Sequence, residues 1–151
     1  MTLEAGDPAP EVAAPNQDGE LVRPDVDGPT VLYFYPRDQT SGCTVEARQF
    51  QAELESYREA GVAVYGVSTD DVDDHAAFCD AEGLAFDLLA DVEGEVAEAF
   101  GVSVEGGTAA RTTVVVVDGA IHRVYENVSP DGHARTVLAD LLEAGVASLP
   151  E

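Results

Sequence analysis

Three apolar runs divide the chain into segments of different hydrophobic period. Thr30–Tyr35 is continuous and rich in aromatic and β-branched residues, which predicts a strand that is covered on both faces. Val62–Val67 and Thr112–Val117 have the same character. We therefore expect these three runs to form the centre of one buried sheet.

Between the runs, apolar residues recur at intervals of three or four, as on one face of a helix. From Cys43 to about Ala60 this period predicts a long helix, and Gly61 supplies its stop signal. Thr69 or Asp70 is expected to cap the helix that follows. The further predicted helices cover Val72–Glu82, Glu95–Phe100 and Pro130 to about Ala144.

Turn signals complete the outline of the fold. Gln17-Asp18-Gly19-Glu20 predicts the turn of an N-terminal hairpin, and Asp118-Gly119 predicts a tight turn between two antiparallel strands. The element order is β-α-β-α followed by a hairpin and a helix, which predicts an α/β fold with helices flanking a central mixed sheet. This arrangement is thioredoxin-like, and 151 residues fit a single domain, 1–151. The remaining predicted strands are Phe86–Leu89 and Ala120–Tyr125.

The charge balance narrows the range of partners. The chain has 7 basic residues, all of them arginine, against 30 acidic residues, and its formal net charge is -23. This sign excludes a general affinity for nucleic acid or anionic lipid, and a hydrophobic content of 45% argues against disorder. Acidic groups without lysine are typical of a high-salt cytosol, such as that of a halophilic archaeon. At about 1 M salt the Debye length of roughly 3 Å weakens their repulsion.

No segment of the sequence predicts export or a membrane span. The first twenty residues lack the apolar stretch of a signal peptide, and the longest apolar runs are too short to cross a bilayer. Two cysteines, Cys43 and Cys79, are too few for a secreted disulfide framework. We therefore expect a cytoplasmic protein whose cysteines are reactive or buried.

The candidate chemistry lies where the long helix begins, at Cys43. A thiol is nucleophilic only as the thiolate, and a free cysteine in water has a pKa near 8.5. The first turn of a helix offers unpaired N–H groups and the positive end of the dipole, which both favour the anion. Gly42 allows close approach to the backbone, and Thr40 can direct its hydroxyl at the sulfur or at a substrate oxygen. Pro36 lacks an N–H group and helps to shield the loop from water.

A local cation is needed to offset the acidic exterior. Arg111 is the candidate because it directly precedes the Thr112–Val117 strand, and strand ends in α/β sheets face such a loop. One arginine about 4 Å from the sulfur is worth up to ~4 kcal/mol at an effective dielectric near 20, before desolvation is counted. The surface charges lie beyond a Debye length, so the arginine should dominate. The alternative is a core cysteine and a surface arginine that never meet.

The spacing Pro36-x-x-x-Thr40-x-x-Cys43, together with the distant Arg111, resembles the active-site signature of the peroxiredoxins. The sequence around it, including Gly-Cys-Thr-Val-Glu-Ala, is similar to the bacterioferritin-comigratory-protein or Q subfamily of the AhpC/TSA-like thioredoxin-fold superfamily. The resemblance covers nearly the whole chain. It implies that Cys43 is the peroxidatic cysteine, which attacks a peroxide and becomes a sulfenic acid. Thr40, Gly42 and Arg111 would bind the peroxide and stabilise the charge on the leaving oxygen.

The resemblance also suggests a role for Glu46, one turn beyond the cysteine. It would orient an arginine, although a glutamate is also an ordinary residue near a helix start. No cofactor is expected, because the sequence contains neither a dinucleotide-binding glycine motif nor a P-loop. No metal site is expected either, and the aspartates at 70, 71, 73 and 74 are interpreted as a solvated helix start rather than a calcium loop. Exposed positions are expected for His75, His122 and His133.

How the sulfenic acid is resolved stays open. Many Q-type members place a resolving cysteine five residues after the peroxidatic one, where this chain has Arg48. Another group places it in the following helix, and Cys79 fits that pattern. Cys79 also has helical spacing with apolar neighbours, so the alternative is a packed core residue and a one-cysteine cycle with an external thiol. A bond to Cys43 requires Cα atoms within ~7 Å, so a helix would have to open locally if the two lie further apart.

Three functions are compatible with these residues. The leading hypothesis is a thiol peroxidase that reduces H₂O₂ and organic hydroperoxides, is recycled by a thioredoxin-like or other thiol reductant, and is a monomer or weak dimer. A thiol–disulfide oxidoreductase usually needs Cys-x-x-Cys, whereas Thr40 occupies the first of these positions here. The third function is a non-catalytic redox sensor or a chaperone-like binder on the same fold.

Overall fold

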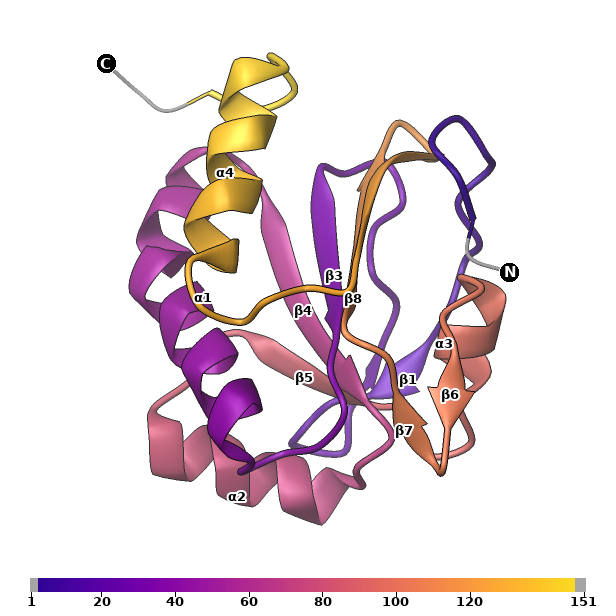
Figure 1. The fold of residues 1–151 in the computed structure, drawn as a ribbon, viewed down its shortest axis with the longest axis vertical. Coiled ribbons are helices and arrows are strands. Elements are labelled where there is room, and N and C mark those ends of the chain that lie inside the picture. Colours follow the sequence, from indigo (N-terminus) through magenta and orange to yellow (C-terminus); the bar gives the residue numbers. More distant parts are fainter. Residues whose placement is uncertain (1–2, 149–151) are drawn as a thin grey trace.

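The computed structural model describes residues 3–148, and a five-stranded mixed sheet lies at its centre (Figure 1). The strand order is β5-β4-β3-β8-β9. Strands β3, β4 and β5 are parallel, while β8 runs antiparallel to β3, and β9 antiparallel to β8. The strands are β3 (Thr30–Phe34), β4 (Ala63–Ser68), β5 (Asp87–Ala90), β8 (Thr112–Val117) and β9 (Ala120–Glu126).

Helices cover both faces of this sheet. The helices α1 (Ser41–Glu59), α2 (Val72–Glu82) and α4 (His133–Glu143) contribute to one apolar cluster. The short helix α3 (Glu95–Ala99) packs on the opposite face with the N-terminal segment. In Figure 1, α1 and α4 accordingly lie on one side of the strands and α3 on the other. The thioredoxin-like α/β fold expected from the sequence is confirmed.

The central strand β3 shows why the sheet is buried on both sides. Val31 and Tyr33 point to the face covered by α1, whereas Leu32 and Phe34 point to the face covered by α3. All four side chains are almost completely buried. Each such side chain contributes about 1.5–3 kcal/mol through the hydrophobic effect. Unbroken apolar character, rather than alternation, is therefore what this strand requires.

Smaller strands lie at the edges of the fold. The N-terminal hairpin predicted from its turn is confirmed as β1 (Ala14–Pro15) paired with β2 (Leu21–Val22). A second hairpin, β6 (Val104–Glu105) with β7 (Thr108–Ala109), was not predicted. Its two-residue strands are too short for a recognisable alternation, and β6 is exposed.

Two helix starts differ from the sequence-based expectation. Helix α4 begins at His133 rather than Pro130, because Gly132 adopts a left-handed backbone (φ 83°) that a helix cannot include. Helix α2 is capped by Asp71, whose carboxylate accepts the N–H of Asp74, and not by Thr69 or Asp70. No helix within residues 3–148 is long and apolar enough to cross a membrane.

Candidate active site

Cys43 lies in the first turn of α1, directly after the loop that follows β3. Its side chain belongs to the apolar cluster beneath α1, and only 1% of the residue is exposed. Among residues 3–148, no acceptor engages the backbone N–H groups of Gly42 and Cys43. The sulfur is therefore set against the unpaired, partly positive end of the helix.

Thr40 explains why these N–H groups remain unpaired. It is the N-cap residue of α1, but its hydroxyl donates to the carbonyl of Arg37 (3.0 Å) instead of accepting from the first turn. The sequence suggested that this hydroxyl points at the sulfur or at a substrate, and the structure turns it toward the loop backbone. Thr40 itself is exposed, and Pro36 is half-buried at the start of the same loop.

Arg111 reaches the cysteine from the other side of the loop. The strand register pairs Thr112 with Phe34, so the residue before β8 lies beside the end of β3. Nη2 of Arg111 lies 3.2 Å from Sγ of Cys43, as a hydrogen-bond donor. The Arg111 carbonyl accepts the N–H of Val128 (3.1 Å), which fixes the backbone at this point. The expected meeting of cysteine and arginine is therefore observed.

Gly42 leaves the space that the guanidinium occupies. A Cβ atom at this position would lie 2.7 Å from Nη2 of Arg111, closer than any normal contact. The same nitrogen is held by Cys43, so it cannot move away without giving up the sulfur. The structure thus shows that the missing side chain makes room for the arginine.

Glu46 binds the other terminal nitrogen of the Arg111 guanidinium. Nη1 of Arg111 donates to Oε1 of Glu46 (3.0 Å), and Glu46 is only 1% exposed. Its second oxygen, Oε2, is buried and has no hydrogen-bond partner within the described part of the chain. Burial raises the pKa of Glu46 to about 7, although the guanidinium opposes the shift. One cation is therefore shared by two buried groups, the thiol and the carboxyl, that are both anions when deprotonated.

The sequence of this chain is similar to those of known proteins. The sequence profile described as the AhpC/TSA family matches residues 5–124. Peroxiredoxin Bcp of Escherichia coli is 38% identical over 151 residues, which cover 93% of this chain and 97% of that protein. The chain belongs to the AhpC/TSA family.

Solved structures agree with this assignment. Peroxidoxin BcpB from Mycobacterium tuberculosis superimposes with a TM-score of 0.86 at 35% identity, covering 93% of this chain and 97% of that one. Peroxiredoxin Q of Xanthomonas campestris gives a TM-score of 0.80 at 32% identity, with 87% and 90% covered. This peroxiredoxin of the Bcp/Q type is a thiol peroxidase, an oxidoreductase that acts on peroxides and draws electrons from thiols.

The second cysteine of this peroxiredoxin lies in quite different surroundings. Cys79 is in the last turn of α2, 9% exposed, and belongs to the same apolar cluster as Cys43, to which it is not bonded. Burial, and then the nearby carboxylates of Asp38 and Asp87, raises the pKa of Cys79 to about 12. At neutral pH its thiol is therefore protonated and weakly nucleophilic.

The C-terminal end of α2 contacts α1 through Arg48. Arg48 forms an ion pair with Glu82 in the last turn of α2. Beyond α2, the side chains of Gln51 and Arg58 bind the backbone N–H and carbonyl of Ala85 (2.7 and 2.9 Å). These contacts hold the C-terminal end of α2 and the residues just beyond it against α1.

The expectation of exposed histidines is wrong for this structure. His75 and His133 are buried, and His122 is half-buried. Nε2 of His133 lies 2.8 Å from the Thr113 hydroxyl, and burial lowers the pKa of His133 to about 4. The sequence predicts surface positions for the three histidines because they have no ligand spacing. The positions of His75 and His133 on the inner faces of α2 and α4 were the missed signal.

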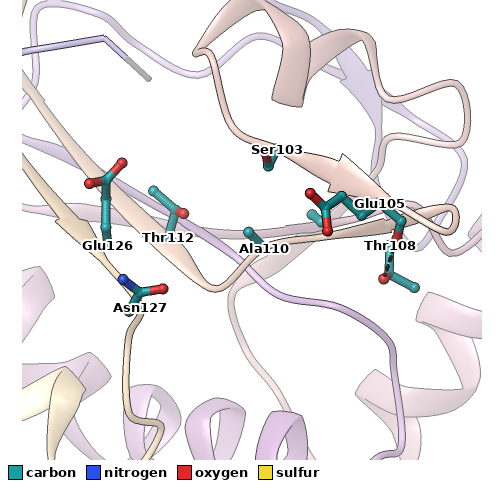
Figure 2. A pocket seen from close by; sticks show the side chains of 8 residues that line it. Ser103, Glu105, Thr108, Ala110, Thr112, Glu126 and Asn127 are labelled. Atoms are coloured by element: carbon teal, nitrogen blue, oxygen red, sulfur yellow. Dashed lines mark hydrogen bonds between the residues drawn. The ribbon is translucent and has the colours of Figure 1, made fainter. Parts of the chain in front are cut away.

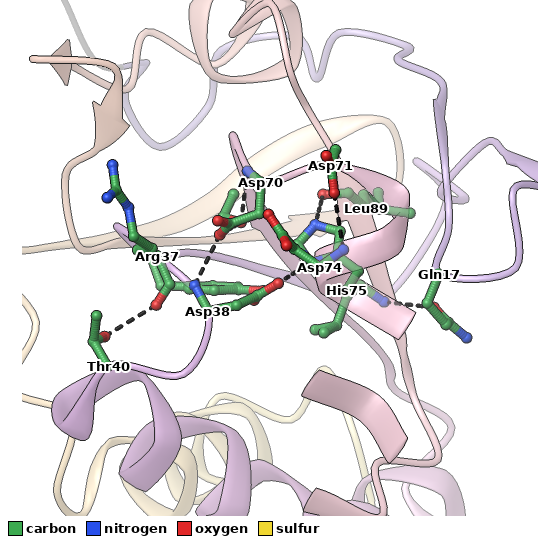
Figure 3. Close-up of polar contacts among 12 residues, drawn as sticks. Gln17, Arg37, Asp38, Thr40, Asp70, Asp71, Asp74, His75 and Leu89 are labelled. Carbon is green, nitrogen blue, oxygen red and sulfur yellow. Dashed lines mark hydrogen bonds and ion pairs between the residues drawn. The ribbon is translucent and has the colours of Figure 1, made fainter. Parts of the chain in front are cut away.

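His75 belongs to a polar network that the sequence did not reveal (Figure 3). It joins Asp38, in the loop before α1, to the start of α2. Asp70 also turns inward and accepts from the N–H of Asp38 (2.8 Å), so only three of the four aspartates at this helix start are solvated.

A separate hollow lies on the far side of the Arg111 segment. Its volume is about 530 Å³, and Figure 2 shows it between the β6–β7 hairpin and the end of β9. Carboxylates, hydroxyls and an amide line it, among them Glu105, Thr112, Glu126 and Asn127. The residues that line it include neither a thiol nor a cation.

Proposed function

We propose that Cys43 is the peroxidatic cysteine of this thiol peroxidase. The observation that carries the proposal is the 3.2 Å contact between Arg111 Nη2 and Sγ of Cys43 at an uncapped helix start. A guanidinium and unpaired N–H groups both favour the thiolate over the thiol. Pro36 shields this side of the pocket, and Glu46 holds the arginine in register with the sulfur.

The thiolate attacks one oxygen of the peroxide, and the O–O bond breaks. A sulfur–oxygen bond forms, the sulfur becomes a sulfenic acid, and the other oxygen leaves as hydroxide or alkoxide, which takes a proton to give water or an alcohol. Negative charge moves from sulfur to the leaving oxygen during this step. Arg111, the N–H groups of Gly42 and Cys43, and the Thr40 hydroxyl after rotation from Arg37 are the donors that stabilise it.

Cys79 is proposed to resolve the sulfenic acid. Its thiolate attacks the Cys43 sulfur, the S–O bond breaks, and hydroxide leaves and takes a proton to become water. The intramolecular disulfide that forms is then reduced by a thioredoxin-like reductant through thiol–disulfide exchange. The sequence separation supports this pairing. Two solved structures of Xanthomonas campestris peroxiredoxin Q carry serine in place of cysteine at positions 36 residues apart, the separation of Cys43 and Cys79.

Resolution requires α2 to open. Cys79 is buried, and its raised pKa keeps the thiol protonated while the helix is packed. Exposure to water restores its ordinary acidity and lets the chain bring the two Cα atoms within ~7 Å. We further propose that the chain acts as one cytoplasmic domain, as a monomer or weak dimer.

Mass spectrometry after one equivalent of H₂O₂ tests both steps. We expect the intact mass to fall by about 2 Da, with the loss mapping to a peptide pair that joins Cys43 to Cys79. In Cys79→Ser we expect a gain of about 16 Da at Cys43. A gain of about 16 Da that persists in the wild-type protein would favour the one-cysteine cycle. Oxidation at Cys79 alone would contradict the peroxidatic role of Cys43. Repeated turnover with a thioredoxin system separates an enzyme from a stoichiometric sensor.

A further inference from the structure

A buried network connects the peroxidatic loop to the helix that carries Cys79 (Figure 3). Tyr35, just beyond β3, donates its hydroxyl to Oδ1 of Asp38 (2.6 Å), and Oδ2 of Asp38 lies 2.6 Å from Nδ1 of His75. Nε2 of His75 lies 3.0 Å from the carbonyl oxygen of Leu89 in β5. The His75 side chain is fully buried and that of Asp38 nearly so. One imidazole thus fastens α2 both to the loop before α1 and to the sheet.

The partners of the ring fix the number of protons in the network. The Leu89 carbonyl can only accept, so Nε2 of His75 carries a proton. Burial raises the pKa of Tyr35 well above its ordinary value, so the tyrosine donates and Oδ1 of Asp38 accepts. Nδ1 and Oδ2 would repel each other at 2.6 Å with a lone pair on each, so a second proton lies between them. The pair therefore holds one proton more than a neutral imidazole and a carboxylate.

Asp70 is a further acidic group beside the ring. It lies on the connection from β4 to α2 and has a carboxylate oxygen within 4.8 Å of the ligand atoms of Asp38 and His75. It already accepts from the N–H of Asp38 and from the hydroxyl of Ser68. Both ring nitrogens are likewise engaged, so the cluster is a satisfied hydrogen-bonded network rather than an open metal site. The other titratable groups on α2 are Asp73, Asp74, Cys79, Asp80 and Glu82, and Asp71 is its N-cap.

We propose that the hydrogen bonds of His75 fasten α2 to the peroxidatic loop, and that they break in the opening that frees Cys79. The proposal rests on the resolving role proposed for Cys79. When α2 opens, His75 leaves Asp38 and the Leu89 carbonyl, so the cost of breaking these buried hydrogen bonds opposes the opening. Asp38 and His75 are thus positioning residues that act through the helix and the loop.

Substitutions of the two partners are expected to affect the opening of α2 differently, because one keeps the hydrogen bonds and the other breaks them. In Asp38→Asn, the amide donates to a neutral ring and still accepts from Tyr35, so the same bonds form without an ionisable proton. In His75→Gln, the bridge from Asp38 to Leu89 is broken and α2 is held less tightly. His122→Gln is the matched control, because His122 is half-buried on β9, at the opposite edge of the sheet from β5.

Alkylation of Cys79 by iodoacetamide measures the opening directly. We use the Cys43→Ser background, where Cys79 is the one remaining thiol, and measure every variant at the same pH. Asp38→Asn should react about as fast as the protein with unaltered Asp38, because the amide keeps the same hydrogen bonds. His75→Gln should react ~10- to 100-fold faster than His122→Gln.

A His75→Gln rate equal to that of the control would overturn the proposal. If His75→Gln does not fold, Asp38→Ala replaces it in the comparison, because this change also removes the link to the ring. A rate for Asp38→Ala equal to that of His122→Gln would likewise overturn the proposal. The readout requires no peroxide and no disulfide. Failure of Cys43 and Cys79 to form a disulfide would therefore overturn the resolving role while leaving the alkylation result intact.

Discussion

The surroundings of Cys43 and Cys79 differ in charge far more than in burial. Both cysteines belong to one apolar cluster, with exposed fractions of 1% and 9%. Cys43 meets an uncapped helix start and the guanidinium of Arg111. Cys79 lies in the last turn of a helix, and the charges that act on it are carboxylates, chiefly those of Asp38 and Asp87.

The difference shows that depth in the core does not decide whether a thiol is reactive. Of the two sulfurs, that of Cys43 has a cation within hydrogen-bonding distance. For Cys79, burial and the surrounding carboxylates act in the same direction, raise its pKa and keep the thiol protonated. In the proposed cycle, Cys43 attacks in the folded state and Cys79 reacts only when its helix opens.

Removing each sulfur gives the strongest test of this contrast. We expect Cys43→Ser to lower the rate of peroxide consumption by at least about 10³-fold, because a hydroxyl is not ionised in the same site. Cys79→Ser should keep the fast first reaction with H₂O₂ and lose only the disulfide. Stopped-flow measurement of the first turnover separates the two variants. Equal losses in both would break the division of roles.

Removing the cation tests why the two thiols differ. We expect Arg111→Ala to lower the second-order rate constant for peroxide by about 10²- to 10³-fold, as for the loss of a donor in an oxyanion site. Arg111→Lys should fall between, because an ammonium keeps the charge but cannot bind the sulfur and Glu46 with two arms. Arg135→Ala is the matched control, since this side chain is 83% exposed on α4. A rate unchanged by Arg111→Ala would contradict the electrostatic explanation.

Glu46→Gln isolates the buried anion beside Cys43. Burial raises the pKa of Glu46 from its ordinary value of 4.5 to about 7, so the folded state binds this proton more tightly. Stability from the protonated form is complete below about pH 4.5 and is lost as the pH rises through 7. Glu46→Gln has no such proton, so its stability does not fall over this pH range for this reason.

We therefore expect the gain in unfolding free energy on Glu46→Gln to be larger at pH 8 than at pH 5, by about 3 kcal/mol at most. Urea denaturation at the two pH values measures it. Glu55→Gln, at an exposed position of the same helix, provides the control. An equal effect of Glu46→Gln at both pH values would show that the carboxyl is ionised throughout.

Gly42→Ala is expected to have the smallest effect and the most specific one. An alanine Cβ would meet Nη2 of Arg111 at 2.7 Å and push the guanidinium off the sulfur. We expect the peroxide rate constant to fall about tenfold, while alanine in the helix raises stability by up to about 1 kcal/mol. Ser41→Ala, at the exposed preceding position, should change neither quantity much. An unchanged rate in Gly42→Ala would show that the arginine has room to spare.

Much of the fold follows directly from the hydrophobic pattern. The bounds of α2 and β8 agree with those predicted, because a capped helix and an unbroken β-branched run are strong local signals. The β6–β7 hairpin was missed, because its pairing depends on a turn of two glycines more than on apolar residues. The start of α4 was placed too early, since the left-handed conformation of Gly132 is set by its surroundings.

Some contacts of the candidate site could likewise be predicted from the sequence, and others could not. The contact between Cys43 and Arg111 was predictable, because a helix start and a strand end meet at one edge of the sheet. The link from Asp38 to His75 was not, because neither residue carries a spacing that distinguishes it from a surface residue. Nor was the direction of the Thr40 hydroxyl, which depends on a rotation about one bond within the loop.

The pairing of Arg111 with Glu46 has a consequence for the oxidised protein. While the sulfur is a thiolate, two anions compete for one guanidinium in a dry pocket, and the local sum is negative whenever Glu46 is ionised. In the proposed cycle Cys43 becomes a sulfenic acid, which is uncharged, so Arg111 and an ionised Glu46 are left as an electroneutral couple. The proposed first step would thereby remove the net charge of the pocket and weaken the electrostatic attraction between Arg111 and the sulfur.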